Sequence, residues 1–147
     1  MYAFPETKKA ICARISRYKT ALKKEKATHG VYTDGSGKRY VLFWLYFVLG
    51  DLQKTKEHIV WFESQFSDDA GEPISQLCWA LSFWRMGQEA AAKRRLAQLM
   101  LTNLYMIPAL IGKPELRHDM WHHSNYADMD YVNEIPSAIL DAIEPED

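Results

Sequence analysis

The residues of this sequence best placed to bind a metal ion are two histidines four positions apart, His118 and His122. On a helix this spacing puts both imidazoles on one face, where they could act as two ligands of one zinc ion. Asp119 follows the first histidine, where a zinc-protease motif requires glutamate, and spacing fixes no third ligand. We therefore interpret the pair as a surface feature and expect no metal and no cofactor. Metal-dependent activity at His118 and His122 is the weakest alternative.

The other groups that could carry catalysis are isolated from one another. Cys12 and Cys78 lie far apart among helix-forming residues, and no histidine is tied to Cys12 by its spacing. We expect both thiols to be free and buried in a reducing compartment. The adjacent carboxylates Asp68 and Asp69 are typical of helix capping and not of an acid–base pair. We therefore predict that the chain is not an enzyme.

A glycine-rich stretch, residues 34–39, is the nearest match to an anion-binding loop. It reads Asp-Gly-Ser-Gly-Lys-Arg and precedes an apolar helical segment, so its backbone N–H groups could meet an anion at the start of that helix. The spacing of a phosphate-binding P-loop is missing, and no convincing strand precedes the stretch. We favour an ordinary turn or loop over an anion site.

Charge is distributed unevenly along the chain. Although the net charge is −1, residues 1–39 carry a balance of +7 and residues 113–147 a balance of −7. Most of the positive charge lies on a helix expected over residues 5–28, and a basic helix can bind a nucleic acid or an anionic surface. The candidate contacts for this alternative function are Arg14, Arg17, Lys23 and Lys24. Aromatic residues for base stacking are scarce there, so we favour a solvated face or one docked on the acidic C-terminal part.

The composition is that of a densely packed protein. Of the 147 residues, 48% are hydrophobic and 13% aromatic, which excludes a disordered chain. The longest apolar stretch, residues 40–49, is too short to span a bilayer, and no secretory signal is expected. We expect a single cytoplasmic domain that contacts no membrane.

The organisation of the chain follows from a helical hairpin that occurs twice. An aromatic helix, a glycine turn and an amphipathic helix recur 37 residues apart, with hairpins expected over residues 38–67 and 74–105. The basic helix precedes them, and helical pieces over residues 115–143 are expected to cap the stack. Pro108 cannot continue an undisturbed helix, so a break is expected near Met106 and Ile107. The predicted fold is an all-α solenoid with these two flanking ends.

Several residues of the two hairpins correspond by position: Tyr46 and Phe83 in the first helices and Gly50 and Gly87 at the turns, with the small residue Ala92 in the second helix of the second copy. In these residues the hairpins resemble tetratricopeptide repeats (TPRs), which pair an aromatic-rich first helix with a glycine turn and a second helix that carries a small residue. The sequence departs from the family at Phe43 and Thr55, where small residues are usual, and neither copy has the closing proline. The match covers about half of the chain. Residues 77–81 and 101–108 are also similar to uncharacterised bacterial repeat proteins.

The resemblance implies a non-catalytic scaffold or adaptor that holds a protein or peptide segment on the concave face of its first helices. Carried over by position, the partner-binding residues are Tyr40, Trp44, Phe47, Leu81, Trp84 and Arg85. Two other interpretations stay open. The chain's own ends could cover these aromatic residues, or a second copy of the chain could do so in a homodimer.

Overall fold

The computed structural model describes residues 3–118 and 124–147, and all regular secondary structure in these ranges is helical. The predicted all-α class is therefore confirmed, and none of these helices is long and apolar enough to cross a membrane. The helices are α1 (Lys8–His29), α2 (Lys38–Leu49), α3 (Leu52–Gln65), α4 (Pro73–Arg85), α5 (Glu89–Thr102), α6 (Met106–Leu110), α7 (Asp130–Asn133) and α8 (Ser137–Ala142), with a 3-10 turn, η1, at Asn125–Ala127.

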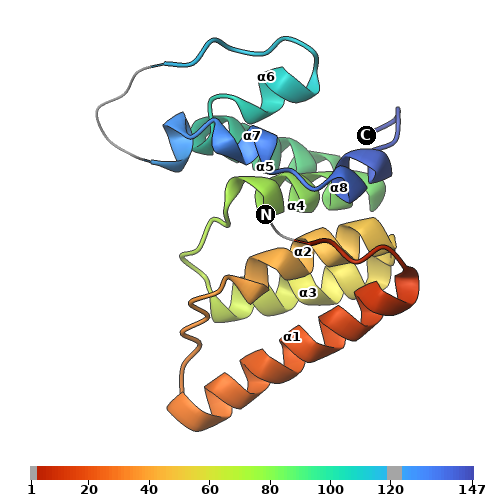
Figure 1. Cartoon of the computed structure of the whole chain (residues 1–147), viewed down its shortest axis with the longest axis vertical. Helices are drawn as coiled ribbons and strands as arrows, with labels where there is room; N and C mark the ends of the chain where they lie inside the picture. Colours follow the sequence, from red (N-terminus) through yellow and green to blue (C-terminus); the bar gives the residue numbers. More distant parts are fainter. Residues whose placement is uncertain (1–2, 119–123) are drawn as a thin grey trace.

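The helices are stacked along the long axis of the molecule (Figure 1). α1 lies along one end, the hairpins α2–α3 and α4–α5 follow, and α6, α7 and α8 lie toward the opposite end. α2 is the central element, since it packs against α1, α3, α4 and α8. This position agrees with its sequence, because a helix that is apolar on nearly every face must be covered on every side.

Side-chain caps mark the residues at which α1, α3 and α4 begin. α1 begins at Lys8, later than the predicted residue 5, because Thr7 Oγ1 accepts a hydrogen bond from the backbone N–H of Ala10 (3.2 Å). α4 begins directly after Glu72, whose carboxylate accepts hydrogen bonds from two backbone N–H groups of the first turn. The linker before α4 thus supplies the capping residue that its composition predicts.

The two repeated glycines end the first helix of each hairpin. Gly50 and Gly87 both have a φ of +71°, a left-handed conformation that glycine adopts without strain. The N–H of Gly50 donates to the carbonyl O of Tyr46 (3.1 Å), and that of Gly87 donates to the carbonyl O of Trp84 (2.9 Å). Two helix–turn–helix hairpins are therefore present at the predicted positions.

α5 ends at Thr102, earlier than predicted, because Asn103 redirects the chain. The Asn103 side chain is fully buried, and its Oδ1 accepts hydrogen bonds from the N–H groups of Tyr105 (3.1 Å) and Met106 (3.0 Å) at the start of α6. The expected break is therefore displaced from Met106 to Asn103. Pro108 lies in the first turn of α6, where its missing N–H removes no helical hydrogen bond.

The buried side chains form two clusters. The larger lies among α2, α3, α4 and α5 and includes Ile139 from α8, and the smaller joins α1 to α2. α1 contributes Ile11, Ile15 and Leu22 to the smaller cluster, all from one narrow stripe. Because a narrow stripe can reach only one neighbour, α1 packs chiefly against α2.

Candidate functional site

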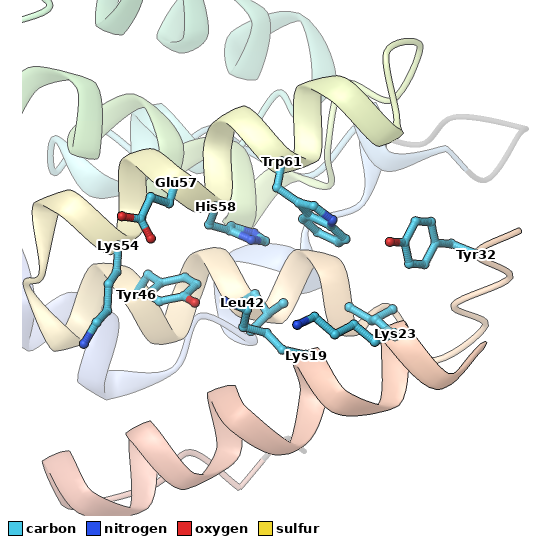
Figure 2. Close-up of a pocket in the computed structure, with 10 residues that line it drawn as sticks. Lys19, Lys23, Tyr32, Leu42, Tyr46, Lys54, Glu57, His58 and Trp61 are labelled. Carbon is cyan, nitrogen blue, oxygen red and sulfur yellow. The ribbon is translucent and has the colours of Figure 1, made fainter. Parts of the chain in front are cut away.

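A cleft opens between α1 and α3, beside α2. The apolar stripe of α1 reaches α2 but leaves α3 uncovered, and the space between α1 and α3 is a cavity of about 200 Å³ (Figure 2). The side chains that give the cavity its character are Lys19 and Lys23 from α1, Tyr32 from the loop after α1, Tyr46 from α2, and His58 and Trp61 from α3.

The lining of the cleft is largely aromatic. His58 and Trp61 project from α3 and stack at 27° with ring centroids 5.4 Å apart. The Tyr46 ring lies 5.3 Å from His58, and Tyr32 meets the Trp61 ring edge-on at 5.6 Å. Offset and edge-on pairs at these distances are favourable, so each ring helps to fix its neighbour. The cleft therefore has a packed apolar lining with few polar groups.

His58 is buried in this lining and is neutral. Its Nε2 lies 3.2 Å from the carbonyl O of Arg39, and since a carbonyl can only accept, Nε2 carries the proton. The pKa of His58 is lowered to about 3, chiefly by burial and to a smaller extent by the positive charge of Lys19, whereas the hydrogen bond to Arg39 acts in the opposite direction. Nδ1 is therefore an unprotonated acceptor, and no donor bonds to it within residues 3–118 and 124–147.

Tyr46 supplies a hydroxyl group to the same cleft. The residue is 3% exposed, and burial raises the pKa of its phenol to about 12, assisted by the negative charges of Glu57 and Asp51. The hydroxyl has no hydrogen-bond partner in the described part of the chain. A base with a pKa of about 3 and an acid with a pKa of about 12 are poorly matched to proton transfer at neutral pH. At neutral pH, therefore, His58 stays neutral and Tyr46 keeps its proton.

Lysines form the rim of the cleft. Lys19 and Lys23 extend from adjacent turns of α1 (Figure 2). Both are exposed, and neither forms an ion pair with a residue that the structure describes. On the α3 side, Lys54 pairs with Asp51 at 3.2 Å, and Glu57 is exposed nearby. The rim therefore carries net positive charge over an apolar lining.

The cleft continues along α1. A second cavity, of about 330 Å³, shares Lys19 and Tyr46 with the first and extends along α1 as far as Cys12. We call the two cavities together the α1 groove. Cys12 is exposed here, contrary to the prediction that both thiols are buried, because it lies beside the apolar stripe of α1 and not in it. Cys78 is buried as predicted.

The six residues predicted to bind a partner do not form one surface. Phe47 and Leu81 are only 2% and 6% exposed, so they cannot line an open groove. The C-terminal segment covers this region: α8 packs against α2, and the guanidinium carbon of Arg85 lies 4.2 Å from the ring centroid of Phe47. For Phe47 and Leu81 the prediction is wrong, and the chain's own end is the covering element.

Trp84 and Arg85 hold this C-terminal segment in place. Trp84 is 42% exposed, but its Nε1 donates a hydrogen bond to the carbonyl O of Glu146 (2.8 Å). Arg85 forms an ion pair with Asp147 (2.6 Å) and donates to the carbonyl O of Ala142. The two residues thus form an intramolecular clasp.

Tyr40 and Trp44 line a separate pocket of about 500 Å³, together with Glu72 and Tyr131. Trp44 Nε1 donates to Glu72 (2.9 Å), and the Tyr40 hydroxyl donates to Asp69 (2.7 Å). The polar atoms of both predicted residues are therefore already bonded within the chain. The α1 groove, in contrast, is lined by two residues with a polar atom that has no hydrogen-bond partner in the described residues, Tyr46 and His58, which makes it the stronger candidate site.

The four basic residues predicted to contact nucleic acid point in different directions around α1. Lys23 lines the α1 groove, whereas Arg17 and Lys24 are roughly 100° or more away from it around the helix. Arg14 is turned toward the N-terminal segment, where its Nη1 donates to the carbonyl O of Ala3 (2.6 Å). No single face of α1 therefore presents all four.

The predicted histidine pair cannot be placed as a pair. His118 is exposed, and its backbone N–H donates to the Tyr105 hydroxyl (2.8 Å). His122 and Asp119 lie outside the described residues. Within residues 3–118 and 124–147, no three His, Cys, Asp or Glu side chains are grouped so that they could hold a metal ion.

At the glycine-rich stretch, the chain supplies its own anion. The carboxylate of Asp34 is buried and accepts hydrogen bonds from the backbone N–H groups of Lys38 (2.8 Å) and Arg39 (2.9 Å) at the start of α2. Arg39 also forms an ion pair with Asp34 at 3.1 Å. The stretch is therefore a self-capped loop, in agreement with the interpretation favoured from its spacing.

No sequence motif joins Lys19, Tyr46 and His58. Tyr46 is recognisable only as an aromatic position of the repeat, and His58 belongs to none of the predicted sites. One signal exists, because Lys19 and Lys23 share a face of α1 and His58 and Trp61 share a face of α3. The two faces border one cavity only because of the way α1 packs against α2, which local sequence signals do not specify.

The fold and the site define an all-α protein with a lysine-rimmed aromatic groove. Comparison of the chain with models of known protein families, with curated proteins and with solved structures found no match.

Proposed function

We propose that this protein is a non-catalytic binding module, TPR-like in the arrangement of its hairpins, that holds an acidic segment of a partner protein in the α1 groove. The observation that carries the proposal is the pair of lysines, Lys19 and Lys23, which stand over an aromatic lining without ion-pair partners in the described residues. Acidic side chains of a bound segment would supply the missing counter-charges.

The shape of the α1 groove favours an extended segment over a small molecule. The two cavities share four lining residues and together follow α1 over about three turns, from Cys12 to Lys23. A bound chain could place one side chain among the aromatic rings and its neighbours along the lysine rim. Buried aromatic anchors surrounded by polar contacts are the usual source of affinity in such complexes.

The alternative, nucleic-acid binding through α1, has less support. A phosphate backbone needs several cations on one face, whereas Arg17 and Lys24 lie away from Lys19 and Lys23 around the helix. Glu57 also lines the groove and would repel a phosphate. An acidic peptide can avoid this carboxylate by placing an uncharged residue opposite it.

The test is a binding titration with two charge-reversed variants of the same helix. A fluorescent acidic peptide with a central aromatic residue is titrated with the wild-type protein at an ionic strength of about 0.15 M, where distant charges are screened. The double variant K19E/K23E is expected to bind at least about tenfold more weakly, a loss of about 1.4 kcal/mol. The matched control, R17E/K24E, changes the net charge equally and is expected to bind nearly as wild type.

Equal losses in both variants would contradict binding in the groove, because they would show that only net charge matters. A labelled oligonucleotide serves as the competing probe. If it binds more tightly than the peptide and R17E/K24E weakens it most, the nucleic-acid alternative replaces the proposal.

A further inference from the structure

Two polar atoms of residues that line the α1 groove, the Tyr46 hydroxyl and His58 Nδ1, have no hydrogen-bond partner in the described residues. Tyr46 and His58 are 3% and 5% exposed. In the described residues the fully buried side-chain atoms without a partner are Gln76 Oε1 and Trp79 Nε1, so the Tyr46 hydroxyl and His58 Nδ1 stay open to solvent. A ligand that excludes solvent from them must replace its hydrogen bonds, because otherwise affinity is lost. Both side chains line the same 200 Å³ cavity, so one bound group could satisfy them together.

The protonation states of these two atoms determine which hydrogen bonds a bound group must form with them. Because Nε2 of His58 donates to the Arg39 carbonyl, Nδ1 can only accept. The Tyr46 hydroxyl keeps its proton at neutral pH and can donate. The complementary group must therefore accept from Tyr46 and donate to His58.

A hydroxyl group meets this requirement better than a charged group does. A carboxylate accepts only, and it would face the lone pair of His58 Nδ1. An ammonium group donates only, and it would lie close to Lys19 and Lys23. A hydroxyl does both and carries no charge that must be buried.

The lining and the size of the cavity favour a hydroxyl group that is attached to a flat, apolar ring. A cavity of roughly 150 Å³ is known to hold one benzene molecule, so about 200 Å³ is sufficient for a single substituted ring. The rings of Tyr32, Tyr46, His58 and Trp61 offer faces and edges against which such a ring can pack.

We propose that the anchor of the bound segment is a tyrosine side chain, whose phenol oxygen accepts from the Tyr46 hydroxyl and donates to His58 Nδ1. This inference rests on the proposed function, because it names the side chain that the acidic segment inserts. Acidic residues beside the tyrosine lie along Lys19 and Lys23, so the recognised pattern is a tyrosine flanked by carboxylates.

The experiment compares three peptides that share the same acidic flanks and carry Tyr, Phe or Ala at the anchor position. Their affinities are measured by fluorescence anisotropy against the wild-type protein and the variants Tyr46→Phe and His58→Phe. The Tyr peptide is expected to bind wild type about tenfold more tightly than the Phe peptide, because it alone forms hydrogen bonds with both the Tyr46 hydroxyl and His58 Nδ1. The Ala peptide is expected to be the weakest, since it leaves the aromatic lining unfilled.

In each variant the Tyr-to-Phe affinity ratio is expected to fall toward one, because one of the two hydrogen bonds to the phenol is lost. General destabilisation of the fold would weaken both peptides and leave this ratio unchanged. Should His58→Phe unfold the protein, Tyr46→Phe measures the same ratio, since it removes only an oxygen that makes no bond within the described residues.

The outcomes separate the two proposals. Equal binding of the Tyr and Phe peptides, both tighter than Ala, would overturn the phenol anchor and leave the acidic-segment function in place. Failure of all three peptides to bind would overturn both. If p-cresol alone bound as tightly as the Tyr peptide, the pocket would belong to a free phenol, and the acidic-segment function would be rejected.

Discussion

The two hairpins are similar in construction but differ in how completely they are covered. At the second hairpin, α4–α5, the C-terminal segment closes the face that α4 shares with α2: α8 packs against α2, Ile139 has no exposed surface, and Arg85 of α4 forms an ion pair with Asp147. The first hairpin, α2–α3, is covered on one side by α1, which leaves the α1 groove open beside His58 and Trp61. The covering elements, not the hairpins themselves, decide which face is available.

The difference arises from the apolar patterns of the two covering elements. α1 presents a single stripe, Ile11, Ile15 and Leu22, and lysines occupy the positions next to it. α8 is short, but it contacts α2 and contributes Ile139 to the larger buried cluster. A narrow stripe beside lysines produces an open, charged groove, whereas insertion of an apolar residue produces a closed core.

The largest expected difference in unfolding free energy is between alanine substitutions of two tryptophans, one in the buried core and one in the groove. Trp79 is 1% exposed and stacks on Phe43 at 4.9 Å, so Trp79→Ala is expected to reduce the free energy of unfolding by about 3–5 kcal/mol. Trp61 is only partly buried and borders a cavity, so Trp61→Ala is expected to cost about 1–2 kcal/mol. Urea denaturation followed by circular dichroism measures both. Equal losses would mean that the groove is as closed as the core.

The second prediction concerns pH and tests the burial of neutral His58. Its pKa is about 3 in the folded protein against 6.5 when exposed, so the unfolded chain takes up the proton first as the pH falls. Stability is therefore lost below about pH 6.5, by about 2 kcal/mol between pH 7 and pH 5 from this residue. The difference in unfolding free energy between wild type and His58→Phe should change by that amount over the same range.

The matched control for the pH experiment is His29→Gln, because His29 is exposed at the end of α1. Its unfolding free energy should follow the pH dependence of the wild type closely. A wild-type pH profile that His58→Phe leaves unchanged would show that His58 is not buried in its neutral form.

The third prediction concerns the clasp, in which Trp84 and Arg85 hold the C-terminal segment in place. Arg85→Ala removes the ion pair to Asp147 and the hydrogen bond to the Ala142 carbonyl, and it is expected to cost about 1 kcal/mol. Hydrogen exchange should become faster in α8 and stay unchanged in α1. Faster exchange in both helices would indicate global destabilisation instead of local opening.

The smallest effect is expected from the lysines of the groove. Lys19 and Lys23 are exposed and have no ion-pair partner in the described chain, so the double variant K19A/K23A is expected to change unfolding free energy by less than about 0.5 kcal/mol. The same variant should bind the acidic peptide more weakly. A large loss of stability would mean that these lysines support the fold and not a partner.

Local sequence signals were sufficient for the hairpins. α2 occupies the predicted residues, Lys38–Leu49, because Gly37 and Gly50 bracket a continuous apolar run. The turn at Gly87 and the capping linker before α4 were equally readable, since each depends on residues within one helical turn. The all-α class follows from these elements.

Contacts between distant residues set the limit of prediction. Asn103 ends α5 because its Nδ2 donates to the carbonyl groups of Asn125 (2.6 Å) and Asp128 (2.8 Å), far along the chain. The burial of Phe47 and Leu81 likewise depends on where the C-terminal segment packs. Repeat alignment places both residues on the first helices but cannot show which face another segment covers.

Binding of the acidic Tyr peptide in the α1 groove can be followed directly in the indole region of a ¹H–¹⁵N spectrum during titration. Trp61 lines the α1 groove, Trp44 lines the separate pocket, and Trp84 belongs to the clasp. Binding in this groove is expected to shift the Trp61 signal strongly and to leave the Trp44 and Trp84 signals almost unchanged. A shift of Trp44 or Trp84 with Trp61 unchanged would place the partner on the face predicted from the repeats and contradict the α1 groove.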